Sequence, residues 1–217
     1  LPPLLLALAV SIGSPATSPR VAADPGAQEP PLRVFVRAGP KTHGEGEHDH
    51  PRFLAEWSVL LAERGATVEG GQRFPTADEL ARTDVVVFYA AEGASIHGAD
   101  REALTAFLAR GGGIAVLHDA VCGDDPHWFR TVAGGAWEHG HSKWHEGEIG
   151  LYFTDVDHPI TRGAAHFDMD DEVYWDLHLD PDATVLANSF HTPFDVTPQM
   201  WTLERGGGRA FVSIQGH

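Results

Sequence analysis

The chain has 217 residues, of which 42% are hydrophobic and 21% are charged, so it suits one globular domain with a sizeable core. Its formal net charge of −16 argues against binding to nucleic acid or to an anionic membrane, because both partners require a basic surface. The sequence contains 14 histidines and a single cysteine, Cys122, which excludes an internal disulfide and any multi-cysteine zinc site.

The first segment of the chain has the pattern of a signal peptide. Residues 1–13 form an apolar run that is too short to span a bilayer, and residues 21–23 (Val-Ala-Ala) have the pattern of a cleavage site. We therefore expect residues 1–23 to be an N-terminally incomplete signal peptide and the mature protein to be exported, either to the periplasm or outside the cell. The proline-rich residues 24–31 are expected to be a flexible lead-in to a domain at 32–217.

Strand and helix patterns alternate in the first half of this domain. Strands are predicted at 32–36, 67–69, 84–89 and 114–117. Apolar residues on one face, with cap and stop residues at the ends, predict helices at 51–64, 76–80 and 99–110. Buried strands that alternate with helices indicate an α/β fold with a parallel sheet that is covered on both faces.

The pattern changes beyond residue 127. Short strands separated by turns are expected at 147–153, 171–175, 184–188, 199–203 and 209–214. The glycine-rich residues Gly134–Gly150 are expected to form a sharply bent loop before and into the first of them. The chain stops at residues 214–217, directly after the last expected strand. Because a parallel sheet normally sends its last strand into a covering helix, we expect a C-terminal piece to be missing.

Polar clusters follow several of the expected strands, at the sheet edge where open parallel sheets bind their ligands. The loop after the first strand carries His43 and His48, a later strand ends in His118 and Asp119, and the last strand ends in His217. Because the carboxyl ends of parallel strands share one edge, we expect these groups to converge. Imidazole and carboxylate groups together form either a metal site or an acid–base set.

Two further segments carry residues suited to a binding pocket. The glycine-rich segment holds Trp137 and His141, and indole rings give flat platforms on which sugar rings stack, although core packing explains a tryptophan equally well. At the entry of a later strand, Glu172 offers a general base or a hard metal ligand, and Tyr174 follows it as a pocket residue. Together these segments indicate a crowded region of imidazoles and carboxylates.

The chain contains, in this order, the motifs GPKTHGEGEHDHPRF, IAVLHDAVCG, GGAWEHGHSKWHEG, DHPIT, DDEVYWDLHL, PQMWTLE and GRAFVSIQGH. Together they resemble the ThuA-like (trehalose-utilisation) family, over nearly the whole chain from Arg33 to His217. The resemblance implies the class I glutamine amidotransferase-like fold, which is an α/β, three-layer, flavodoxin-like sandwich with a mostly parallel central sheet.

The amidotransferase resemblance also allows a test of the chemistry. In the amidotransferases a cysteine nucleophile sits on the turn after a central strand, and its partner histidine follows a late strand. Here His118 and Asp119 occupy that turn, Cys122 comes after it, and His217 stands at the position of the partner histidine. Because a thiolate nucleophile needs its base within about 3 Å, we expect no glutamine amidotransferase activity.

The resemblance implies a role in sugar utilisation, including the processing of 3-keto-disaccharides. A proton beside a keto group is acidic, so a base and an electrophile together can remove it and stabilise the enediolate. We therefore expect an enzyme of the isomerase, lyase or hydrolase type that acts on a small-molecule carbohydrate. The expected catalytic residues are His118, Asp119, Glu172 and His217. We expect a divalent metal ion, whose identity the sequence does not indicate, to be bound by His118, His141 and His217. The expected substrate-binding residues are His43, His48, Trp137 and Tyr174.

Two other functions stay open at this point. A non-catalytic carbohydrate-binding or accessory module would use the tryptophans alone, so sugar binding would survive the removal of His118 and His217. A metal-dependent hydrolase on the same scaffold would instead release product from an unoxidised glycoside or ester.

Overall fold

The computed structural model describes residues 30–192 and 195–217, and residues 31–217 form one compact unit. The expected signal peptide at 1–23 and nearly all of the expected lead-in at 24–31 lie outside the described residues. Among the helices of the described ranges, none is long and apolar enough to cross a membrane.

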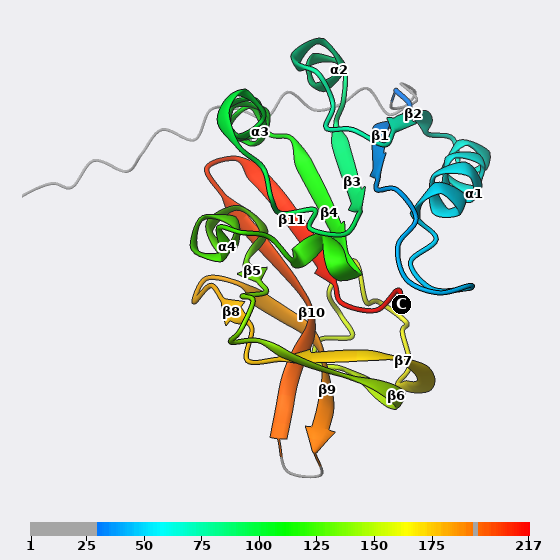
Figure 1. Cartoon of the computed structure of the whole chain (residues 1–217). Helices are drawn as coiled ribbons and strands as arrows, with labels where there is room; N and C mark the ends of the chain where they lie inside the picture. The colour runs from blue at the N-terminus through cyan, green and yellow to red at the C-terminus, as the bar shows by residue number, and fades with distance from the viewer. Residues whose placement is uncertain (1–29, 193–194) are drawn as a thin grey trace, which may run out of the picture. The chain divides into compact units, whose positions relative to one another are not determined.

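Within the described residues, the central feature is a nine-stranded sheet with the order β2-β1-β3-β4-β11-β10-β9-β6-β7. Half of it is parallel, and Figure 1 shows these strands side by side in the upper part of the molecule. The parallel strands are β1 (Arg33–Ala38), β2 (Thr67–Gly71), β3 (Val85–Tyr89), β4 (Gly113–Leu117) and β11 (Gly208–Ser213). Strands β3 and β4 are continuous apolar runs, and β1 contains the buried run at residues 34–36, because both faces of these strands are covered.

Helices pack on both faces of the parallel half. On one face, α1 (His50–Glu63) places Phe53 and Leu54 against the valines of β1 and β3. On the other face, α2 (Ala77–Ala81), α3 (Gly98–Ala109) and α4 (Pro126–Ala133) contribute to the larger buried cluster, which includes Phe107 and Phe129. Side chains cap the starts of α1, α2 and α4, and at α2 Thr76 and Glu79 form a reciprocal capping box.

The other half of the sheet is antiparallel, so the sheet as a whole is mixed. It consists of β10 (Asp195–Arg205), β9 (Thr184–Thr192), β6 (Lys143–Phe153) and β7 (Phe167–Trp175), each antiparallel to its neighbour. These strands form the lower part of the molecule in Figure 1. The β6–β7 hairpin is the part of this half that reaches the functional site.

Two features around residue 134 differ from the sequence prediction. The segment expected to be a glycine-rich loop contains the short strand β5 (Gly135–Ala136), which pairs with β8 (His178–Leu179), and β6 begins within it at Lys143. Helix α4, which precedes it, was not predicted. A strand replaces the expected loop because Gly134 adopts a left-handed φ of 82° and ends α4, so the chain turns there directly into β5.

Candidate active site

The candidate site lies at the edge where β1, β4 and β11 end. The loop after β1 brings His48, the short 3₁₀ turn after β4 brings His118 and Asp119, and the chain after β11 brings His217. Strand β7 adds Glu172 from the antiparallel half of the sheet. Residues that are far apart in the sequence therefore meet at one sheet edge.

Ring nitrogens of three histidines converge at this edge. His48 Nε2 lies 3.0 Å from His118 Nε2 and 3.0 Å from His217 Nδ1. Glu172 approaches the same nitrogens, with Oε2 3.4 Å from His118 Nε2 and Oε1 3.4 Å from His217 Nδ1. One atom from each of these four side chains lies within 4.8 Å of the others, a spacing that could hold a metal ion.

Hydrogen bonds behind the rings determine where the protons sit. His48 Nδ1 lies 2.9 Å from Asp119 Oδ2, and His118 Nδ1 lies 2.7 Å from the carbonyl oxygen of Ile214, so both Nδ1–H groups donate. Burial lowers the pKa of His118 to about 4, so this ring is neutral at neutral pH and its Nε2 carries a lone pair. His48 Nε2 faces this nitrogen at 3.0 Å, and the neutral His118 ring has no N–H on that side to bridge the gap. A cation between the two ring nitrogens would bind the lone pair of His118, so the donor set fits a divalent metal ion.

Asp119 orients two histidines from behind the cluster. Its carboxylate binds His48 Nδ1 and lies 3.2 Å from His50 Nε2. Burial alone would raise the pKa of Asp119, but hydrogen bonds from both histidines hold it below its usual range, so the group is ionised. Burial would likewise lower the pKa of His50, yet its bonds to Asp119 and to the carbonyl oxygen of Pro40 raise it. A carboxylate behind a ligating imidazole is typical of metal sites, because it fixes the tautomer and the ring orientation.

The backbone at three histidines of the site is strained. His43, His48 and His118 have φ values of 60°, 42° and 51°, in the left-handed region that residues other than glycine seldom adopt. Such conformations persist only where the surroundings impose them, and they are concentrated at functional sites. The loop that carries His43 and His48 is held by Lys41, whose ammonium group donates to carbonyl oxygens within the loop.

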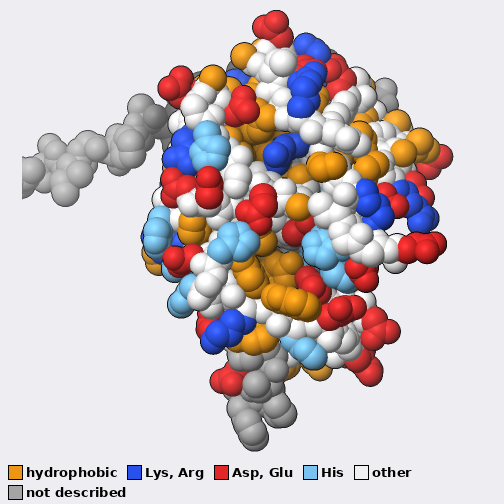
Figure 2. Space-filling model, in the orientation of Figure 1, with side chains coloured by type: hydrophobic (Ala, Val, Ile, Leu, Met, Phe, Trp, Pro, Cys, Tyr) orange, Lys and Arg blue, Asp and Glu red, His pale blue; other side chains and the backbone are white. Residues whose placement is uncertain are grey.

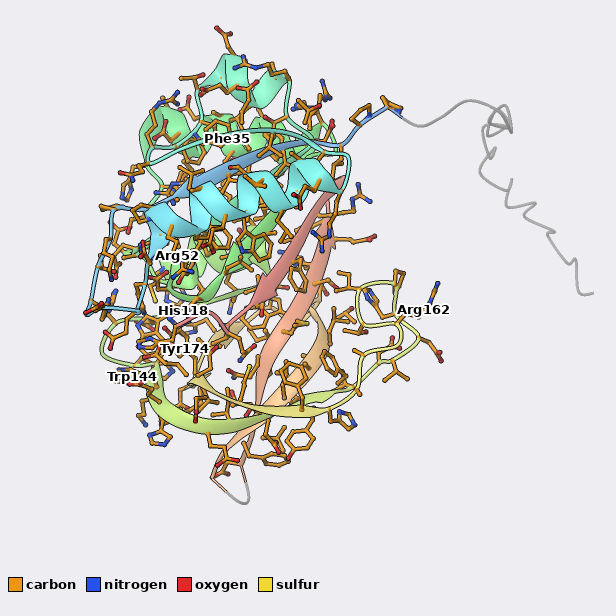
Figure 3. The ribbon with its side chains drawn as sticks, turned by 90° about the vertical axis from the view of Figure 1, so that its right-hand side faces the viewer. Phe35, Arg52, His118, Trp144, Arg162 and Tyr174 are labelled. Carbon is orange, nitrogen blue, oxygen red and sulfur yellow. The ribbon has the colours of Figure 1, made fainter. Side chains whose placement is uncertain are left out.

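A pocket of about 480 Å³ opens over the cluster. Its wall includes Trp137, whose ring centroid lies 4.8 Å from that of Tyr174, and Trp144, which is 55% exposed at the rim. Figure 3 shows His118, Tyr174 and Trp144 on the same side of the molecule, and Figure 2 shows histidine side chains beside a hydrophobic patch near the middle of the visible face. Aromatic faces next to imidazoles and carboxylates suit a ligand that combines flat rings with hydroxyl groups.

The structure brings together most of the residues that the sequence singled out. His118, Glu172 and His217 meet in the cluster, and Asp119 lies directly behind it. The pocket wall contains the four expected substrate-binding residues His43, His48, Trp137 and Tyr174. Sequence reasoning assigned His48 to substrate binding only, whereas its ring nitrogen lies among the candidate ligands. It assigned no role to His50, although this residue belongs to the same histidine-rich segment as His48 and its ring lies beside Asp119.

His141 is a correction to the expected set of metal ligands. Its ring stacks on that of His178, with centroids 5.2 Å apart, and it belongs neither to the cluster nor to the pocket wall. The reason is the β5–β8 pairing: the turn after β5 folds back on the carbonyl oxygen of Glu138 and leaves His141 beside β8. Among the candidate ligands His48 takes its place.

This architecture defines the class to which the protein belongs: an α/β protein whose polar site lies where parallel strands end, within a mixed sheet. The model of the ThuA family, described as trehalose utilisation, matches residues 41–217, and the chain belongs to this family. No curated protein matches the chain.

Solved structures share this fold. A ThuA-like protein from Bacteroides uniformis ATCC 8492 has a TM-score of 0.67 at 18% identity, over 90% of this chain and 86% of that one. A ThuA-like protein from Parabacteroides merdae ATCC 43184 has a TM-score of 0.66 at 15% identity, over 86% of this chain and 80% of that one. A β-galactosidase from Rahnella sp. R3 has a TM-score of 0.63 at 14% identity, over 86% of this chain but 29% of that one. At these identities the likeness shows the fold alone.

Proposed function

We propose that the protein is a sugar-active enzyme that removes a proton beside the keto group of a 3-keto-disaccharide or a related sugar, assisted by a divalent metal ion. It has no glutamine amidotransferase activity in this proposal. The observation that carries it is the convergence of three imidazoles and Glu172 beneath a pocket with Trp137 and Trp144 in its wall. Membership of the trehalose-utilisation family agrees with a carbohydrate substrate.

The proposed chemistry divides the cluster between two tasks. His48, His118 and His217 would hold the metal ion, because their ring nitrogens converge. When bound, a divalent ion acts as a Lewis acid toward a carbonyl oxygen and makes the neighbouring C–H group more acidic. Burial raises the pKa of Glu172, which makes its carboxylate a stronger base than an exposed one, and we assign it the role of accepting the proton. Tyr174 orients that carboxylate through a hydrogen bond.

We also propose that the parallel half has the flavodoxin-like, three-layer arrangement of the class I glutamine amidotransferase-like proteins. Its strand order, β2-β1-β3-β4-β11, corresponds to the flavodoxin-like order, and helices pack on both of its faces. Export of the protein is part of the same proposal, and it is supported by the apolar run at residues 1–13.

Metal analysis tests the first half of the proposed chemistry. The purified protein, loaded with Zn²⁺, Mn²⁺ or Co²⁺ and then dialysed, should retain a stoichiometric amount of at least one of these ions. The His118→Ala, His217→Ala double variant should lose it. His141→Ala is the matched control, because it removes a histidine that lies outside the cluster, and it should retain the metal. Retention by the double variant would contradict the proposed ligand set.

Proton exchange tests the second half. In D₂O, the metal-loaded protein should exchange the proton beside the keto group of 3-keto-trehalose, which is followed by loss of its ¹H NMR signal. Glu172→Gln should bind the metal but not catalyse the exchange. A parent protein that binds the sugar without exchange, and a double variant that binds it equally well, would instead support a non-catalytic carbohydrate-binding module.

A further inference from the structure

The carboxylate of Asp171 links two residues of the site through their backbone amides. Asp171 Oδ1 accepts a hydrogen bond from the amide of Glu172 at 2.7 Å and from the amide of His217 at 3.3 Å. The amide of Gly216 donates to the same carboxylate, at 3.0 Å from Oδ2. We call this carboxylate with its three amide donors the Asp171 clasp. It joins β7 to a segment 46 residues further along the chain.

The segment that carries His217 needs such a restraint. Strand β11 ends at Ser213, so residues 214–217 lie beyond the sheet ladder. Gly216 has a φ of 143°, a conformation that side-chain-bearing residues rarely adopt, and a Cβ there would lie 3.3 Å from His118 Cβ. The hydroxyl of Tyr89 holds the other side of this segment by donating to the carbonyl oxygen of Gly216 at 2.5 Å.

We infer that Asp171 is a positioning residue of the site, which fixes the His217 ring relative to Glu172 through the amides of both residues. The inference rests on the proposed function, because it treats His217 as a metal ligand and Glu172 as the base. Charge-assisted hydrogen bonds from three amides to one carboxylate are stronger than neutral ones, so a single side chain can hold this geometry. Without it, the last residues of the segment lose their tie to β7, and the His217 nitrogen leaves the cluster for part of the time.

Metal affinity tests the positioning role. We expect Asp171→Ala to weaken Zn²⁺ binding by about 10- to 100-fold, the usual effect of losing a supporting group around a metal site. Asp171→Asn should lie between this variant and the parent, because its amide keeps one acceptor oxygen and replaces the other with a donor. Asp170→Asn is the matched control: it removes the same charge from an exposed neighbour on the same strand, opposite Glu148, and should bind Zn²⁺ like the parent. Dissociation constants are measured by competition with a chromogenic chelator.

Hydrogen exchange in the metal-free protein gives a readout that does not depend on the metal. The peptide that contains Gly216 and His217 should exchange faster in Asp171→Ala than in the parent or in Asp170→Asn, while the thermal midpoints of the two Asn variants stay alike.

Each contrary result has its own meaning. Unchanged exchange in Asp171→Ala overturns the clasp. Faster exchange with the parent's Zn²⁺ affinity overturns the positioning role. A parent that binds no Zn²⁺, Mn²⁺ or Co²⁺ overturns both the metal-assisted function and the positioning role of Asp171. In that case the hydrogen-exchange rates of the metal-free protein still show whether the Asp171 clasp exists.

Discussion

The thiol of Cys122 borders the pocket but is held in its neutral form. The residue is 8% exposed, and burial raises its pKa, an effect that the nearby carboxylates of Glu92 and Asp119 reinforce. A protonated, buried thiol is a poor nucleophile. We predict that iodoacetamide leaves the native protein unmodified at neutral pH and alkylates it fully in urea, as intact-mass measurement will show. Rapid alkylation of the native protein would contradict this prediction and favour thiol chemistry.

Single residues of the site differ in how far the sequence predicts them. The approach of His48, His118 and His217 follows from topology, because loops after parallel strands share one edge. The topology does not determine which histidine of a loop points into the site. His48 and His118 turn inward through left-handed backbone conformations, with φ of 42° and 51°, which no local pattern predicts for a residue other than glycine. His141 was chosen on composition alone, and the β5–β8 pairing carries it to His178 instead.

At the scale of elements, α4 has ordinary start and stop signals that the sequence contains. Asp125 accepts a hydrogen bond from the amide of Trp128, Pro126 opens the helix, and Gly134 ends it. The helix was missed because it is short and is followed directly by glycines, tryptophans and histidines, which together have the composition of a loop. A prediction from local composition therefore missed α4, whereas the combination of its start signal and its stop signal would have identified the helix.

The end of α4 allows a prediction about packing. Gly134 and Gly140 have nearly the same left-handed φ, 82° and 83°, but a Cβ at Gly134 would lie 3.0 Å from atoms of Trp201 and Leu203, whereas a Cβ at Gly140 meets nothing within 4 Å. Gly140→Ala should lower the free energy of unfolding by about 1 to 2 kcal/mol through backbone strain alone. Gly134→Ala should cost more, because Trp201 is fully buried and cannot move away freely.

Urea denaturation of both variants measures this difference. Equal losses for Gly134→Ala and Gly140→Ala would mean that the β10 side chains give way, and that the junction between α4 and the sheet is looser than the contacts indicate.

At the scale of the whole molecule, the two halves of the sheet differ in how well the sequence predicts them. Strands β1, β3 and β4 stand out as apolar runs because they are buried on both faces. The antiparallel strands were located, but their lengths and partners depend on contacts that are distant in sequence, such as Tyr152 opposite Asn188. One sequence does not show these pairings. Since Glu172 reaches the cluster only through this half, the site could be predicted only in part.

Repulsion between acidic groups acts across the whole molecule, because the chain carries a formal net charge of −16. The β6–β7 hairpin adds to it locally by pairing Glu146 with Glu172 and Glu148 with Asp170, and like charges directly opposite one another are destabilising. Exposed ion pairs such as Arg33–Asp84, with side chains 47% and 34% exposed, offset little of this, since water and salt screen surface pairs strongly. Net repulsion should therefore outweigh the attraction of surface pairs.

We accordingly predict that NaCl stabilises this protein at neutral pH. Raising the salt from about 0.01 M to about 0.15 M shortens the screening length from about 30 Å to about 8 Å, which weakens long-range repulsion throughout the molecule. The midpoint of thermal unfolding, measured with a chelator present to remove bound metal, should rise. Near the isoelectric point of about 5.1 the net charge is close to zero, so the same salt should change the midpoint little. A midpoint that falls with salt at neutral pH would show that ion pairs such as Arg33–Asp84 govern the stability and that the excess negative charge does not.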